Sequence, residues 1–312
     1  MDIIVVCHTE FGFTSGKKIV FDKKGRQGVK SGVKNLIELA GKYKAKITFT
    51  VCPEVVDFFP KNTYHEIGLH VHPGWEKFSK PEFEWFVGDQ YLKEHCRQSS
   101  FSSALSDHPY SEQFEMIKIG KEYLKNRLGV ESKVFVAGRG SVNDDTIKAL
   151  VENGFSHDCS ALANKKLAYL DWSRLPRICM PYHPDAGDYQ KKGDLPILIV
   201  PAAQVIYGRS IAPESVPNFG FSWFKACFLE YYRQKAPLFH IFTHSPTMTS
   251  PYYLSVMDSF FSFISKYDNI NFKFASQIKE YPDANYKTYL WSYLFSPNKE
   301  IAKTILKKFK GL

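Results

Sequence analysis

The N-terminal stretch MDIIVVCHTE (residues 1–10) is an apolar, β-branched run that ends in polar residues. A continuous apolar run of this length is typical of a strand that is buried on both faces. The segment that follows repeats apolar residues at helical spacing, at Val29, Val33, Leu36, Ile37 and Ala40. The chain is therefore predicted to begin with a buried strand and a helix.

The same alternation continues to about residue 275. Further strands are predicted at KITFTV (46–51), EIGLHV (66–71), KVFVAG (133–138), FSHDCS (155–160), LPILIVP (195–201), LFHIFTH (238–244) and NFKF (271–274). Helical patterns separate most of them, at 112–128, 144–154, 221–234 and 252–266. Strands that alternate with helices predict a parallel sheet covered by helices.

About seven such units without a glycine-rich dinucleotide fingerprint favour a closed or nearly closed α/β barrel over an open dinucleotide-binding sheet. We expect a distorted (β/α)7-type barrel as a single domain over residues 1–280, with long loops at about 73–110 and 161–195. Residues 281–312 are predicted to form a basic, aromatic helical extension.

The composition narrows the classes of partner and location that the protein can have. The 312 residues are 44% hydrophobic and carry a net charge of +9, which fits a globular protein with a sizeable core. The lysines are dispersed and no nucleic-acid-binding signature occurs, so no nucleic-acid partner is expected. The basic end, 302–312, allows at most peripheral membrane contact. The first residues lack the pattern of a signal peptide, so a cytoplasmic location is predicted. The oligomeric state is left undefined.

Titratable side chains follow several predicted strands. His8 and Glu10 end the first, and His70 and His72 end the third. Arg139 follows the fourth, Asp158 ends the fifth and His244 ends the seventh. Active sites of such barrels lie at the carboxyl ends of the strands. Residues two apart in a strand share a face, so His70 and His72 are expected to point together. A carboxylate and two imidazoles suit a divalent metal, zinc foremost, and Glu10, His70 and His72 supply that set.

Five motifs in order carry a resemblance to a known family: CHTEFGF (7–13), HEIGLHVHPGW (65–75), AGRGSVNDDTIKALVENGFSHDCS (137–160), PYHPD (181–185) and FHIFTHS (239–245). Together they resemble the polysaccharide deacetylases (NodB-like), in the branch with an Asp-Thr-Glu first motif and a His-x-His second motif. The resemblance covers roughly residues 2–275. It implies a distorted barrel and a metal-dependent hydrolase that removes the N-acetyl group of an amino sugar in a glycan or glycan precursor.

The resemblance also assigns roles. His244 matches the family's general acid, and Arg139 matches the arginine that orients the base. The sequence departs from the family at His8, which replaces the aspartate that serves as base. His8 could act as the base, could be an additional metal ligand, or could mark a lost base. In the last case the chain would be a catalytically silent sugar-binding or scaffolding protein.

Four further residues are candidates for substrate contact: Trp75, Asp158, Trp172 and His183. Aromatic rings give sugars a flat apolar surface on which to stack. Each of the four could instead have a purely structural role, since tryptophans commonly pack in cores and polar residues of loops commonly lie on the surface.

Overall fold

The computed structural model describes residues 1–21, 25–73, 75–80, 83–88, 90–100, 102–206, 209–282 and 284–309. A curled parallel sheet of seven strands lies at its centre, in the order β14-β9-β8-β5-β4-β1-β17. The bounds are Leu198–Ile199 for β14, His157–Asp158 for β9, Val134–Ala137 for β8, Glu66–Val71 for β5, Ile47–Val51 for β4, Asp2–Thr9 for β1 and Leu238–His244 for β17. A short strand, β18 (Asn271–Phe272), pairs with the start of β1.

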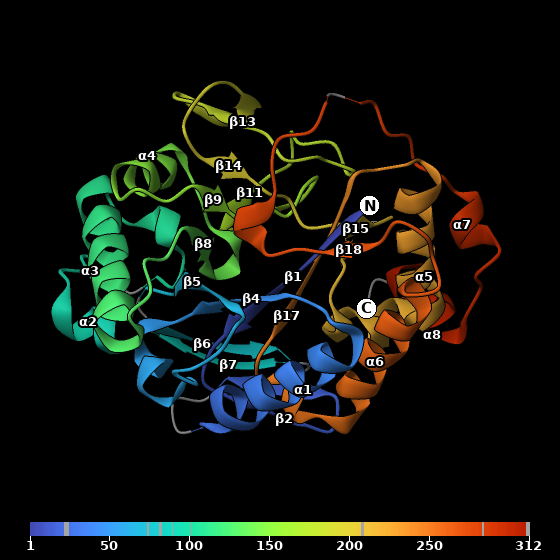
Figure 1. Cartoon of the computed structure of the whole chain (residues 1–312), viewed down its shortest axis with the longest axis horizontal. Coiled ribbons are helices and arrows are strands. Elements are labelled where there is room, and N and C mark those ends of the chain that lie inside the picture. The colour runs from blue at the N-terminus through green and yellow to red at the C-terminus, as the bar shows by residue number, and fades with distance from the viewer. Residues whose placement is uncertain are drawn as a thin grey trace.

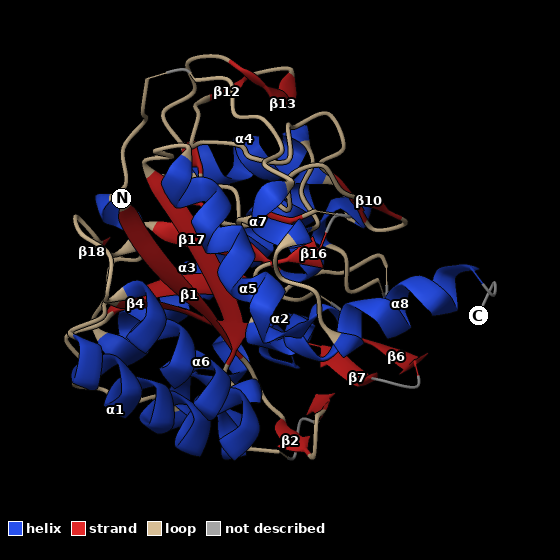
Figure 2. Ribbon diagram, turned by 90° about the vertical axis from the view of Figure 1, so that its right-hand side faces the viewer, coloured by secondary structure: helices blue, strands red, loops and turns tan. Residues whose placement is uncertain are grey.

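Helices surround this sheet, as Figure 1 shows. They are α1 (Val33–Tyr43), α3 (Tyr110–Leu128), α4 (Asp144–Glu152), α5 (Val216–Arg233) and α6 (Pro251–Ile264). In Figure 2, β1 and β17 run side by side through the body. The segment that follows β14 reaches the other edge strand, β17, since Ala203 N donates to His240 O at 3.0 Å. The predicted (β/α) barrel architecture is confirmed.

Both faces of the sheet are buried, which explains the unbroken apolar run of β1. Ile3, Val5 and Cys7 pack against the surrounding helices. Ile4 and Val6 point to the opposite face and join a second core inside the barrel. His8 has the parity of Ile4 and Val6, so the interior of the barrel changes from apolar to polar at the carboxyl end of β1.

Local sequence signals determine where α4 begins and ends, and thereby where β9 starts. The Asn143 side chain accepts a hydrogen bond from Thr146 N at 2.9 Å, and Thr146 Oγ1 accepts one from Asn143 N at 3.2 Å. This reciprocal cap begins the helix directly after the β8 turn. Gly154, with φ of 69°, follows its end and returns the chain to β9.

The predicted loops contain short strands that the sequence did not indicate. Within 73–110, β6 (Trp75–Lys80) and β7 (Phe83–Gly88) join β2 (Phe13–Ser15) and β3 (Lys18–Phe21) in a second sheet, and α2 spans Gln90–His95. Residues 161–195 contain two hairpins, β10 (Lys166–Leu167) with β11 (Leu170–Asp171), and β12 (Pro184–Asp185) with β13 (Asp188–Lys192). A further hairpin pairs β15 (Gln204–Val205) with β16 (Arg209–Ser210).

The last two helices among the described residues are α7 (Trp291–Leu294) and α8 (Lys299–Phe309). Both lie beside α5 in Figure 1. None of the helices described is long and apolar enough to span a bilayer.

Candidate metal and catalytic site

Side chains from several strands converge at the carboxyl end of the sheet. His8 of β1 lies opposite His244 of β17, and His70 of β5 lies opposite Val136 of β8. His8, His72 and His244 line a cavity of about 220 Å³. The structure thus brings together five of the predicted site residues, which are His8, Glu10, His70, His72 and His244.

His70 is held by its backbone-facing nitrogen. Its Nδ1 lies 2.9 Å from Val136 O, so Nδ1–H donates to that carbonyl. This bond leaves the Nε2 lone pair directed toward Glu10, whose Oε1 is 3.5 Å away. A hydrogen bond from one ring nitrogen to a carbonyl is how metal-binding histidines are commonly oriented.

Glu10 is fixed by hydrogen bonds between the segment after β1 and the segment after β17. Glu10 N donates to Ser245 Oγ at 3.1 Å, and Ser245 Oγ donates to Glu10 O at 3.2 Å. Burial favours the neutral carboxyl, but the imidazoles of His70 and His72 outweigh it and lower the pKa of Glu10 to about 2. Glu10 is therefore a carboxylate over the whole working range of pH.

His72 lies flat against Gly138. A β-carbon on Gly138 would be 2.3 Å from His72 Nδ1, well inside any normal contact. The absence of a side chain at position 138 therefore makes room for the imidazole. In this position His72 Nε2 is 3.8 Å from Glu10 Oε2.

These three residues fit a divalent metal. Ligand atoms that share a tetrahedral ion at about 2.1 Å are roughly 3.4 Å apart, and the two nitrogen-to-oxygen separations above are 3.5 and 3.8 Å. Within the described part of the chain, the buried atoms Glu10 Oε1 and His70 Nε2 have no hydrogen-bond partner. Buried polar atoms without partners are costly, and a bound cation would satisfy both.

Gly138→Ala is expected to weaken metal binding about 10- to 100-fold, because the added methyl group displaces His72. Isothermal titration of the apoprotein with zinc measures the change. Gly41→Ala is the matched control, since a β-carbon there meets no atom within 4 Å. Equal zinc affinities in the two variants would contradict the role given to Gly138.

His244 is paired with Glu214, a residue that the sequence analysis did not identify. Glu214 Oε1 accepts hydrogen bonds from His244 Nδ1 at 3.1 Å, from His244 N at 2.9 Å and from Thr247 Oγ1 at 2.6 Å. Burial disfavours the charged imidazole, but the hydrogen bond and charge of Glu214 outweigh it and raise the pKa of His244 above its usual value. The protonated form of His244 is thereby stabilised.

Arg139 lines the same cavity from the turn after β8. Its backbone is left-handed, with φ of 61°, a conformation that costs a residue with a side chain roughly 1–3 kcal/mol. The guanidinium stacks over the Tyr169 ring, 4.8 Å from its centroid. Lys165 also lines the cavity, so two cations and an aromatic ring border it on this side.

His8 lies among the other imidazoles. Its ring centroid is 4.8 Å from that of His70 and 4.9 Å from that of His244, and the ring stacks on Phe242 at 5.3 Å. Burial, followed by the neighbouring imidazoles, holds the pKa of His8 well below its usual value. Ligand atoms of His8, Glu10 and His244 also lie within 4.8 Å of one another, so ligation and base catalysis both stay geometrically open.

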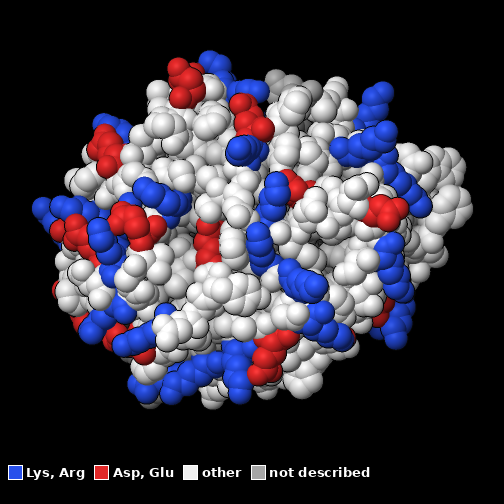
Figure 3. All heavy atoms as spheres, in the orientation of Figure 1, with Lys and Arg blue, Asp and Glu red and all other residues white. Residues whose placement is uncertain are grey.

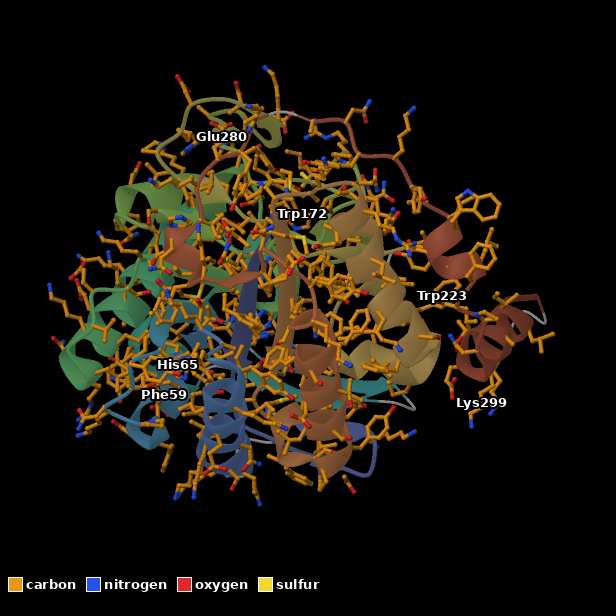
Figure 4. The ribbon with its side chains drawn as sticks, turned by 45° about the vertical axis from the view of Figure 1, so that its right-hand side comes forward. Phe59, His65, Trp172, Trp223, Glu280 and Lys299 are labelled. Carbon is orange, nitrogen blue, oxygen red and sulfur yellow. The ribbon has the colours of Figure 1, made fainter. Side chains whose placement is uncertain are left out.

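The four residues predicted for substrate contact are not among the described residues that line this cavity. Trp172 is fully buried and its Nε1 donates to Gly140 O at 2.9 Å; Figure 4 shows it inside the fold. His183 Nδ1 is bonded to the loop carbonyl of Leu195, at 2.8 Å. The side chain of Trp75 lies outside the described residues.

Asp158 is fully buried and faces away from the cavity. It lies opposite Phe135, whose side chain belongs to the core between sheet and helices. Its Oδ1 accepts hydrogen bonds from the main chain and hydroxyl of Ser160. Among the described residues, Oδ2 has no partner. Burial raises the pKa of Asp158 to about 7.

This shift predicts a pH-dependent stability. Between about pH 4 and 7 the folded state keeps the Asp158 proton that the unfolded state releases, so stability falls as pH rises. Asp158→Asn removes this loss, and its free energy of unfolding relative to wild type should increase over that range by an amount on the order of 4 kcal/mol. Urea unfolding at pH 4, 5.5, 7 and 8 tests it; a constant difference between the two proteins would refute it.

No protein-family model matches the sequence, and no curated protein matches it. Solved structures do resemble its fold. The PuuE allantoinase is similar with a TM-score of 0.57 and 14% identity, over 88% of this chain and 87% of that chain. A Pseudomonas aeruginosa PAO1 protein described as a polysaccharide deacetylase gives a TM-score of 0.56 and 15% identity, over 88% of both chains.

A Mycobacterium smegmatis protein, also described as a polysaccharide deacetylase, gives a TM-score of 0.52 and 16% identity, over 87% of this chain and 88% of that chain. At these identities the similarity shows the fold. The fold implied by the sequence resemblance is thus confirmed, and the branch within the family stays a prediction.

Proposed function

We propose that this chain is a metal-dependent amide hydrolase that removes the N-acetyl group from an amino sugar in a glycan or glycan precursor. The observation that carries the proposal is a cluster of side chains beside the cavity that combines two arrangements. A buried carboxylate and two imidazoles, with ligand atoms within 4.8 Å of one another, lie beside a histidine whose protonated form is stabilised by a second carboxylate. Amide hydrolysis needs both, because the carbonyl must be polarised and the departing amine must receive a proton.

Each residue has a role in this proposal. Glu10, His70 and His72 would hold the divalent metal, zinc foremost, which when bound supplies Lewis acidity toward the amide carbonyl and a water. His8 takes a proton from the attacking water. As the carbon–nitrogen bond breaks, His244 gives its proton to the amine, and Glu214 fixes its ring through Nδ1. Acetate and a free amino sugar are the products.

The walls of the cavity favour an anionic precursor. Arg139 and Lys165 line it together with Tyr169, so a sugar ring and a phosphate could be held by the same wall. We therefore expect nucleotide- or lipid-linked N-acetylated sugars to be better substrates than neutral chitin fragments. Two of the structural neighbours are described as polysaccharide deacetylases, which supports an N-acetylated sugar as the substrate. The third is an allantoinase, so an amide that is not a sugar is tested as an alternative substrate.

The test is acetate release from a panel of N-acetylated sugars, sugar nucleotides and chitin fragments, with allantoin hydrolysis measured in parallel. Acetate release that a chelator abolishes and zinc restores is the expected result. If the protein hydrolysed allantoin and none of the sugars, the proposed substrate would change from an N-acetylated sugar to another amide. A protein that binds zinc but releases nothing from any compound would instead be a catalytically silent binding protein, in line with the substitution at His8.

Glu214→Gln is expected to lower kcat about tenfold, because the neutral amide no longer stabilises protonated His244. Without the carboxylate the pKa of His244 falls, so the alkaline limb of the kcat profile should move to lower pH. Glu38→Gln, an exposed carboxylate on α1, is the control. A lower kcat with an unmoved alkaline limb would show that Glu214 has only a structural role.

A further inference from the structure

Exposed apolar side chains gather at the C-terminal end of the chain. Among the described residues, nine large hydrophobic side chains are exposed, and seven of these lie between residues 289 and 306. The seven are Tyr289, Leu290, Trp291, Leu294, Phe295, Ile305 and Leu306. Phe295 is 78% exposed and Trp291 is 57% exposed, with their rings stacked 5.6 Å apart. A contiguous exposed apolar surface marks an interaction site more often than a lone exposed residue does.

This surface is presented by a firmly anchored segment. Tyr293 OH donates to the buried Glu230 Oε2 at 2.6 Å, and the Tyr293 ring packs edge-on against Trp223 at 5.1 Å. Asn298 Nδ2 donates to Phe219 O at 3.0 Å. Figure 4 shows Trp223 beside the C-terminal helices. The anchors bury one side of α7 and α8 while the apolar residues of the other side stay in solvent, so their exposure does not come from fraying.

Helix α8 has two distinct faces. Ile301 is buried and Thr304 is half-buried, so this face packs on the body. Ala302, Ile305 and Leu306 recur at i, i+3 and i+4 on another face and are all exposed. A second apolar stripe that the fold leaves uncovered is typical of a helix with an external partner.

Charge identifies the partner. Residues 284–312 contain six lysines and one glutamate. Lys299 and Lys303 are exposed beside the apolar stripe, and Lys299 points away from the body in Figure 4. In Figure 3, Lys and Arg side chains run down the right-hand part of the molecule next to an uncharged lobe at its edge, where α7 lies in Figure 1. Apolar and aromatic residues interleaved with lysines match the interface of an anionic bilayer.

We propose that α7 and α8 dock this protein on the surface of an anionic lipid bilayer. The aromatic and aliphatic side chains enter the interface, and the lysines contact lipid phosphates. A second copy of the chain is disfavoured as the occupant because it would bring an equally basic surface onto this one. In Figure 2, α8 leaves the body on the side where β10 lies. Leu167 of β10 lines the cavity, so the docked bilayer lies on the cavity's side of the molecule.

The test is flotation of the full chain with vesicles of phosphatidylcholine alone or mixed with phosphatidylglycerol. Binding to the mixed vesicles only, weakened by salt, is expected. Combined replacement of Trp291, Leu294 and Phe295 by serine should weaken binding at least about tenfold. Tyr64→Ser, at a 65% exposed aromatic residue elsewhere, should not. Likewise, Lys299→Glu with Lys303→Glu should weaken binding at least about tenfold, whereas Lys34→Glu with Lys125→Glu should weaken it less.

Circular dichroism melting establishes that each variant folds. A loss of flotation can then be attributed to the altered surface of α7 and α8 and not to unfolding. The proposal is overturned if wild type floats with neither vesicle, or if the serine variant floats as well as Tyr64→Ser. It is also overturned if light scattering finds a wild-type dimer that the serine substitutions convert to monomer, because the apolar surface then binds a second copy.

Discussion

His70→Ala is expected to abolish stoichiometric metal binding and to lower kcat/KM by about a thousandfold or more. His70 is fully buried, its Nδ1 is committed to Val136 O, and its Nε2 faces Glu10 Oε1. Alanine removes one of the three proposed ligands and leaves Glu10 Oε1 without the imidazole that faces it. Elemental analysis of the purified variant and acetate release at substrate concentrations well below KM measure the two losses.

The control is His65→Gln in the same strand region. His65 is also buried, but its Nδ1 accepts a hydrogen bond from Ile47 N at 3.3 Å, at the far end of β5 from the site. A glutamine side chain can accept the same bond, so this variant should keep its metal. If His70→Ala retained one zinc per chain, other residues would have to be the ligands, and the metal part of the proposed function would fail.

Much of the frame of this site could be predicted from the sequence. Strand parity predicted that His70 and His72 share a face, and the barrel pattern predicted that strand ends from distant parts of the chain meet. His8 and His244, 236 positions apart in the sequence, are opposite each other in the register of β1 and β17. These inferences succeeded because periodicity and topology fix where the end of a strand lies.

The remaining features depend on tertiary contacts that no local pattern encodes. Glu214 comes from the segment between β16 and α5, and β16 is not part of the central sheet. It reaches His244 only because that segment folds over β17. The sequence indicates only that Gly138 lies in a turn, yet its role depends on the ring of His72, which approaches from the end of β5. Trp172 and His183 lie in a long loop, where periodicity does not define side-chain direction. Asp158 directly precedes the cavity-lining Cys159, and successive residues of a strand point to opposite faces, so its side chain faces away from the cavity.

The second large effect concerns His8, the position at which the chain departs from the family that it resembles. If His8 is the base, its imidazole must be neutral when water attacks. Burial and the imidazoles of His70, His244 and His72 hold its pKa well below 6.5, and a bound cation would shift it in the same direction. The acid limb of kcat/KM should therefore lie below pH 6.5, with activity falling only as pH drops through that limb.

His8→Ala should then lower kcat by about 10²- to 10⁴-fold while one metal ion stays bound. His8→Asp, which introduces the family's residue, should recover much of that loss, because a carboxylate at this position can take the same proton. Elemental analysis with kcat for all three proteins separates the alternatives. Loss of metal in His8→Ala would make His8 a ligand, as its distance from Glu10 and His244 also allows. An alanine variant with unchanged metal and unchanged kcat would remove His8 from the mechanism, and the base would have to be sought among the other residues of the cavity.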